Sequence, residues 1–136
     1  SDNPVYSLPN LSNLGRIDMN DTHLAIGCYP GGSSFKVLEL SMLSSPSYQT
    51  VPGQDCPSEV SFNDKGFFIP GDDKIIGWNS VADALAGSSP TMSFGGKTDK
   101  TNIGTKMAAG IGWDGYHFWV GEYKFSNRLL GFAPSK

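Results

Sequence analysis

The sequence repeats itself with a spacing of 43 residues, and this repeat limits the folds open to the chain. Leu8, Val51 and Phe94 are 43 residues apart, and each ends a short β-prone run that stops at Pro or Gly. Units of about this length that contain four short strands are typical of the blades of a β-propeller. A β-sandwich or an unrelated meander of short strands is the alternative architecture.

Three further landmarks recur in every unit. The runs Asn20–Gly27, Asn63–Pro70 and Asp114–Gly121 align without a gap, and each begins with a polar pair that suits a tight hairpin. A large apolar residue precedes each turn, at Met19, Phe62 and Trp113. A basic residue, two aliphatic residues, a spacer and a large apolar residue close each unit, at Lys36–Leu40, Lys74–Trp78 and Arg128–Phe132. The third unit has about eight extra residues between Gly95 and Ala109.

These landmarks predict an all-β fold of three four-stranded propeller blades in one domain. The repeats are expected at about residues 4–43, 46–86 and 89–133. Along each repeat the strands follow in the order d, a, b, c, so that the outer strand d of one blade comes from the next repeat. We expect Tyr48–Val51 to complete the first blade and Met92–Phe94 to complete the second.

Several of these runs resemble the NHL repeat. Trp119–Glu122 followed by Ser126–Leu130 resembles its pattern of a strand, an acidic residue, an Asn-Arg pair and an aliphatic strand. Ile75–Ser80, followed by the linker Gly87–Pro90, resembles the end of a bacterial NHL-like repeat. The first repeat departs from the family, since it has an inserted loop at Cys28–Phe35 and lacks the Asn-Arg pair. The resemblance implies a propeller fold, and it implies no single activity because fold does not determine function.

Three blades are half of a six-bladed propeller, and closed propellers have about four to eight blades. Three blades alone would leave two sheet faces uncovered. We therefore predict a homodimer, the commonest oligomer, in which the N-terminal strand Val5–Leu8 of each chain supplies the missing outer strand of its partner. The alternative is that the chain is half of a longer protein.

The expected binding face is the one that carries the d–a and b–c connections, because the large length differences between repeats fall there. Binding residues favour variable loops on a rigid scaffold. The candidate ligand-binding residues are Tyr29, Asp55, Asp72, Asp73, Lys106, Glu122, Tyr123 and Lys124. The alternative interpretation of each is an ordinary solvated loop residue.

Other residue types give weaker indications. Cys28 and Cys56 fall on the same face in adjacent blades, so they could form one disulfide or remain free thiols. The two histidines, at equivalent positions of the a–b hairpins, are expected to be structural or surface residues. The three tryptophans, Trp78, Trp113 and Trp119, are expected to pack between blades, and an exposed one would reopen the question of a sugar platform.

Charge and motifs exclude several classes of function. The net charge is −3, and no run of like charges makes a phosphate-binding footprint, so no nucleic-acid partner is predicted. No apolar stretch approaches the roughly 20 residues that span a membrane. Nucleophile-elbow, His-Glu-x-x-His and Walker motifs are lacking, and no catalytic residue, metal site or cofactor is predicted. The sequence gives no compartment.

The function predicted from the sequence is a non-catalytic binding module that presents its loop face and central pocket to a protein or a small ligand. The rival prediction is an enzyme of the lyase or hydrolase type that occurs in some NHL-like propellers. That enzyme would need a metal or a cluster of polar groups at the propeller axis, with Glu122 or Asp72 as the expected ligand.

Overall fold

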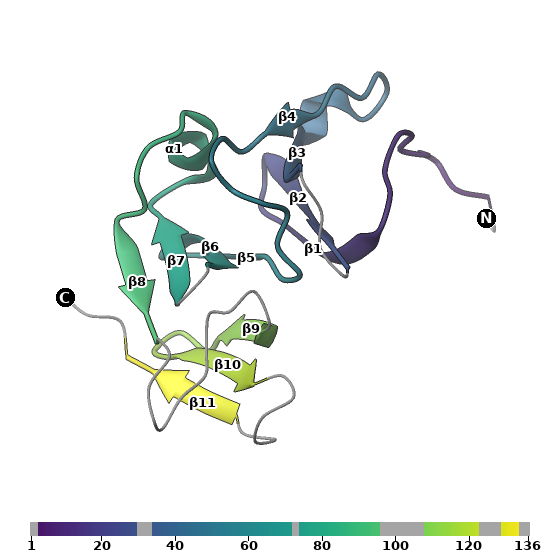
Figure 1. The fold of residues 1–136 in the computed structure, drawn as a ribbon. Helices are drawn as coiled ribbons and strands as arrows, with labels where there is room; N and C mark the ends of the chain where they lie inside the picture. Colours follow the sequence, from purple (N-terminus) through teal and green to yellow (C-terminus); the bar gives the residue numbers. More distant parts are fainter. Residues whose placement is uncertain (1–2, 30–33, 72–73, 96–107, 123–128, 134–136) are drawn as a thin grey trace.

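The chain forms three antiparallel sheets that follow one another along the sequence, as a computed structural model shows (Figure 1). The structure describes residues 3–29, 34–71, 74–95, 108–122 and 129–133, with the backbone alone for 108–110 and 122. Sheet 1 contains β1 (Leu14–Met19), β2 (His23–Cys28), β3 (Lys36–Glu39) and β4 (Gln49–Thr50). Sheet 2 contains β5 (Ser61–Asn63), β6 (Gly66–Pro70), β7 (Ile75–Trp78) and β8 (Met92–Phe94). Sheet 3 contains β9 (Ala108–Trp113), β10 (Phe118–Glu122) and β11 (Leu129–Phe132).

The first two strands of each sheet form the same hairpin. The side chains of Asn20, Asn63 and Asp114 each accept a hydrogen bond from the backbone N–H two residues later, at 2.9, 2.8 and 2.7 Å. Such contacts form the turn locally, before any distant contact is made. The predicted alignment of the hairpins is confirmed, since equivalent residues lie opposite one another: Met19 and Leu24, Phe62 and Phe67, Trp113 and Phe118.

The third strand of sheet 1 differs from the prediction by two residues. Trp78 and Phe132 lie opposite the first phenylalanine of β6 and of β10, whereas in sheet 1 the residue opposite Leu24 is Leu38. The sequence pattern had predicted Leu40 at this position, and Leu40 instead begins the 3₁₀ helix η1 (Leu40–Met42). Because side chains alternate between the two faces of a strand, a shift of two residues leaves every side chain on its expected face.

The outer strands pair as predicted. β4, within Tyr48–Val51, pairs with β3, and β8 pairs with β7. Val5–Leu8, predicted to be an exchanged strand, belongs to no strand of its own chain. The connection between β7 and β8 contains the helix α1 (Val81–Leu85), which the sequence pattern did not predict and whose first turn is capped by Ser80. No helix among the described residues is long and apolar enough to cross a membrane.

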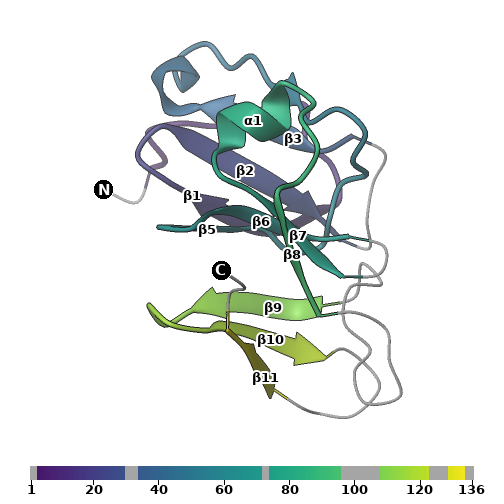
Figure 2. The same ribbon diagram turned by 90° about the vertical axis from the view of Figure 1, so that its left-hand side faces the viewer.

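Sheet 2 lies between the other two sheets, and each of its faces makes a joint with one of them (Figures 1 and 2). Alternate residues of β6 point to opposite sides, so that Phe67 and Ile69 join the core with sheet 1 and Phe68 joins the core with sheet 3. The joint between sheets 2 and 3 is built on Phe68, Ile75, Phe118 and Val120, all buried. The first strands of the three sheets contact one another in order, β1 with β5 and β5 with β9.

Candidate interaction site

The face of sheet 3 that points away from sheet 2, here called the trailing face, carries exposed apolar side chains. Trp119 is 38% exposed and Leu129 is 66% exposed. Trp119 occupies the position of Phe68 in sheet 2, and Leu129 that of Ile75, since both pairs have the same place in the register of their strands. Phe68 and Ile75 are fully buried in a joint between sheets. The trailing face therefore has the residue pattern of a sheet face that packs against another sheet, but no sheet of the described chain covers it.

The ring of Trp119 lies over Gly131 of the neighbouring strand. A Cβ atom at Gly131 would be 2.9 Å from Cζ3 of the indole, closer than such atoms approach in proteins. Gly77 has the same relation to Phe68, where a Cβ would be 2.4 Å from the ring. In both sheets the glycine lets a large ring lie against the strand beside it, and the outer side of the ring is left to meet another surface.

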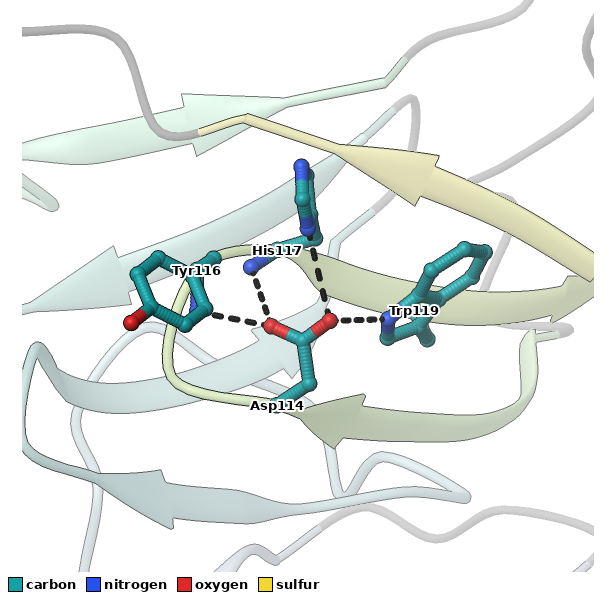
Figure 3. A network of polar contacts seen from close by, with 4 residues as sticks. All are labelled: Asp114, Tyr116, His117 and Trp119. Carbon is teal, nitrogen blue, oxygen red and sulfur yellow. Dashed lines mark hydrogen bonds and ion pairs between the residues drawn. The ribbon is translucent and has the colours of Figure 1, made fainter.

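A polar network around Asp114 holds Trp119 in place (Figure 3). Oδ2 of Asp114 accepts a hydrogen bond from the indole Nε1–H at 2.9 Å and lies 3.3 Å from Nδ1 of His117. Oδ1 accepts the backbone N–H groups of Tyr116 and His117, both at 2.7 Å. The indole hydrogen bond, followed by the backbone ones, holds the pKa of the Asp114 carboxyl well below its usual range. The carboxylate is therefore charged at neutral pH and accepts from all these donors.

This network satisfies the hydrogen-bonding group of the exposed tryptophan within the chain. The indole N–H is the one polar group of the ring, and it is already bonded to Asp114 within the chain. A partner can therefore cover the ring without leaving the indole N–H buried and unpaired, which would cost about 1–3 kcal/mol. Of the three tryptophans predicted to pack between blades, Trp78 is buried and Trp113 packs on Phe118 at 4.6 Å. Trp119 is exposed in the single chain, so for this residue the packing between blades stays a prediction.

The face of sheet 1 that points away from sheet 2, here called the leading face, is also apolar. Leu14, Ile17 and Met19 are each more than half exposed. Met19 occupies the position of Phe62 and Trp113, and Ile17 that of Ile111. All three of these equivalents pack against the buried core of a joint. The leading face thus carries side chains at the positions that, in sheets 2 and 3, pack against the preceding sheet.

The N-terminal segment lies beside sheet 1 and leaves a pocket of about 220 Å³. The hydroxyl of Tyr48 donates to the carbonyl of Pro9, and Lys36 Nζ donates to the carbonyl of Asn10 at 3.0 Å. The pocket is lined by Leu11, Ser12, Asn13, Leu14, Ile26, Cys28, Ser34 and Lys36. Apolar and polar residues contribute equally to this lining, and none of the described residues in it is acidic.

The structure describes only part of the predicted binding face. Tyr29 follows β2 and is 64% exposed, and Asp55 is exposed in the connection before β5. Their neighbours Cys28 and Cys56 form a disulfide with a Cα–Cα distance of 5.6 Å, which brings the two candidates to one part of the surface. Glu122 ends β10, and its side chain lies outside the described residues. The other candidates, Asp72, Asp73, Lys106, Tyr123 and Lys124, also lie outside them.

The two histidines sit at equivalent points of their hairpins. Nδ1 of His23 is 2.7 Å from Oγ1 of Thr22, and Nδ1 of His117 is 3.3 Å from the carboxylate of Asp114. Each histidine therefore takes part in the contacts of its own turn. Within the described residues, no three His, Cys, Asp or Glu side chains come together in a way that could hold a metal ion.

Glu59 is a buried carboxyl that the sequence analysis did not single out. It precedes β5, is 8% exposed, and its Oε2 lies 3.7 Å from Nε of Arg16 in β1. The backbone N–H of Ile111 in β9 also donates to this carboxyl. Glu59 therefore connects the first strands of all three sheets. Asp18 makes a similar connection, since its Oδ2 accepts the backbone N–H of Phe62 at 2.8 Å.

Burial raises the pKa of Glu59 to about 7, and the negative charge of Asp18 adds to this effect while Arg16 opposes it. Its Oε2 accepts no hydrogen bond, which leaves the ionised form poorly compensated. No local signal in the sequence marks Glu59, because its environment is made by strands that are roughly 40 to 50 residues away on either side.

We expect the charge on Glu59 to make the folded chain less stable as the pH rises. The folded state holds the proton up to about pH 7, whereas the unfolded chain loses it near pH 4.5. The free energy of unfolding should therefore fall between these two values, by at most about 3 kcal/mol, and stay level above them. Urea unfolding of Glu59→Gln across this range should show a much smaller decline. The exposed Glu39→Gln variant is the control, and equal slopes in the two variants would contradict this account.

No protein-family model, curated protein or solved structure matches this chain. Its fold and its candidate surfaces are therefore established by the structure alone, and the resemblance to NHL repeats remains an expectation from the sequence.

Proposed function

We propose that this chain is a non-catalytic binding module, half of an NHL-like propeller, which two copies complete as a ring of six sheets. The observation that carries the proposal is the match between the chain's two outer faces. The trailing face has Trp119 and Leu129 where sheet 2 presents Phe68 and Ile75 to sheet 3. The leading face has Met19 where sheet 3 presents Trp113 to sheet 2.

The two faces therefore correspond to the two halves of one type of joint. In the joint between sheets 2 and 3, the rings of Phe68 and Phe118 are 4.4 Å apart. In the proposed ring, Trp119 of one copy takes the place of Phe68 and meets the leading face of the second copy. Head-to-tail contacts of this type close into a ring when the rotation allows it. Two chains give six sheets, which is within the usual range for propellers, whereas three chains would give nine.

The ring would present its loop face to a ligand, and Tyr29 and Asp55 are the described residues on that face. Charged loops around the axis of a rigid scaffold are a common arrangement for binding. Within the described residues, the rival function, an enzyme, is favoured by Glu59 alone, whose pKa of about 7 suits proton transfer at neutral pH. An 8% exposed carboxyl that is held by Arg16 and by a backbone N–H fits a structural connection better.

Light scattering coupled to size-exclusion chromatography tests the assembly. The expected mass is twice the 14.6 kDa of the chain. Trp119→Ala on the trailing face and Met19→Lys on the leading face should each weaken dimerisation by about 700-fold, because a dimer of either variant loses a central residue worth about 2 kcal/mol from both of its joints. Tyr29→Ala is the matched control, because it also removes an exposed aromatic ring but this ring lies on neither of the two faces.

Mixing the two face variants distinguishes a head-to-tail contact from other dimers. A mixed dimer has one joint in which both faces are altered and one joint in which both are native. It should therefore form more tightly than a dimer of either variant alone. A native chain that stays monomeric, or a mixture that dimerises no better than its components, would refute the proposed assembly.

A further inference from the structure

β11 differs from the corresponding strands of the other two sheets. β3 and β7 each pair with an outer strand, β4 and β8, on the side away from the hairpin. Within the described residues, β11 pairs with β10 alone. The outer edge of β11 is thus a row of backbone donors and acceptors that can pair with an added strand.

The outer strands of sheets 1 and 2 pair at equivalent points. Phe94 lies opposite Ile75, and the backbone N–H of Val51 donates to the carbonyl of Phe35 at 3.0 Å. Phe35 and Ile75 occupy equivalent positions, because Phe35 lies two residues before the partner of Ala25 and Ile75 lies two residues before the partner of Phe68. Both side chains are fully buried. Leu129 has this position in sheet 3 and is 66% exposed. A strand added to β11 would therefore place its equivalent of Phe94 opposite Leu129.

The repeat provides that equivalent in Leu8, which precedes Val51 by the same 43 residues that separate Val51 from Phe94. In its own chain this part of the sequence has no strand partner, and Val5 and Tyr6 are 85% and 52% exposed. The segment lies beside sheet 1, with sheet 2 between it and sheet 3, so it is remote from β11 of its own chain (Figure 1). The pocket lined by Leu11–Leu14, which follow this segment, shows that the residues after it pack incompletely on sheet 1.

We propose that Val5–Leu8 of a second copy adds to β11 as its fourth strand, with Leu8 opposite Leu129, Ser7 opposite Leu130 and Tyr6 opposite Gly131. This inference rests on the proposed dimer and specifies how its sheets are completed. Residues that lie opposite each other in an antiparallel pair point to the same face. Leu8 therefore joins Leu129 and Trp119 on the trailing face, as Phe94 joins Ile75 and Phe68 in the second joint. The exchange is reciprocal, so that both copies of β11 are covered.

Cysteine cross-linking tests this register. Cys28 and Cys56 are bonded to each other, so an added cysteine is the reactive thiol. Copies with Leu8→Cys and copies with Leu129→Cys are each prepared in weak reductant that frees the added thiol and leaves the buried Cys28–Cys56 bond intact. They are then mixed without reductant, oxidised, and separated on a non-reducing gel. Directly opposite residues have Cα atoms within the range of a disulfide. The mixed pair should therefore cross-link about tenfold faster than Val5→Cys with Leu129→Cys, because only the first pair is held together in register.

The control pair makes the result specific, since Val5 is the more exposed residue and would react faster in random collisions. Light scattering on the same mixtures before oxidation, with the Cys28–Cys56 bond intact, separates the two proposals. Dimers that do not cross-link through Leu8 and Leu129, or that cross-link faster through Val5, refute the strand exchange and leave the dimer intact. Mixtures that contain only monomers before oxidation refute both.

Discussion

Replacing Phe68 with alanine is expected to lower the free energy of unfolding by about 3–5 kcal/mol, the usual cost of removing a buried aromatic ring. Phe68 is fully buried, and its ring centroid is 4.4 Å from that of Phe118 and 6.2 Å from that of Phe94. Its loss would leave a cavity at the centre of the joint between sheets 2 and 3. Denaturant unfolding measures the change, and Phe68→Leu should lose less because it fills part of the space.

A second substitution tests the account of this joint. Gly77→Ala alone should cost about 1–3 kcal/mol, because its Cβ would be 2.4 Å from the Phe68 ring. In the Phe68→Ala background the same change should cost little, since the ring is gone. Additive effects of the two substitutions would show that the ring and the glycine do not interact as described.

Removal of the disulfide is the second large effect that we expect. Cys28 and Cys56 are 28 residues apart, and closing a loop of this length in the unfolded chain corresponds to about 3–4 kcal/mol of stability. Both cysteines are buried in the joint between sheets 1 and 2, so the double alanine variant also loses packing there. Thermal or urea unfolding with and without reductant measures the effect.

The double variant Cys28→Ala/Cys56→Ala provides the control for the reductant. Reductant should destabilise the native chain and have no effect on the variant. If the native chain unfolds at the same denaturant concentration in both conditions, the disulfide does not contribute to stability as the loop argument requires.

The hairpins could be predicted from the sequence because their determinants are local. Asn20, Asn63 and Asp114 each build a turn with backbone groups two residues away, so the pairing that follows depends on few distant contacts. Strand alternation then assigns the faces. For the third strand of sheet 1, the sequence predicts a register two residues away from the observed one. The inserted loop at Cys28–Phe35 obscures where this strand begins, and Lys36 imitates the basic residue that starts the strand in the other repeats.

The candidate surfaces were harder to predict. Trp119 has the same sequence context as the buried Phe68, and the number of sheets in the chain, not its neighbours in sequence, decides which of the two is exposed. Glu59 has no marker in the sequence, because its pKa is raised by burial and by the charge of Asp18 in β1, and its N–H donor comes from β9. The short helix α1 depends on a serine cap in a linker that otherwise has the composition of a loop.

The disulfide joins sheet 1 to the connection that leads into sheet 2, and among the described residues sheet 3 is attached by non-covalent contacts. Sheet 3 can therefore open while the first two sheets remain tethered. Opening would expose Phe68 and Ile75, which occupy the same positions as Trp119 and Leu129. The face of sheet 2 exposed in a partly opened chain thus resembles the trailing face of sheet 3 in an intact chain. Two copies in this state could join one sheet too early, a form of misassembly to which repeat proteins are prone.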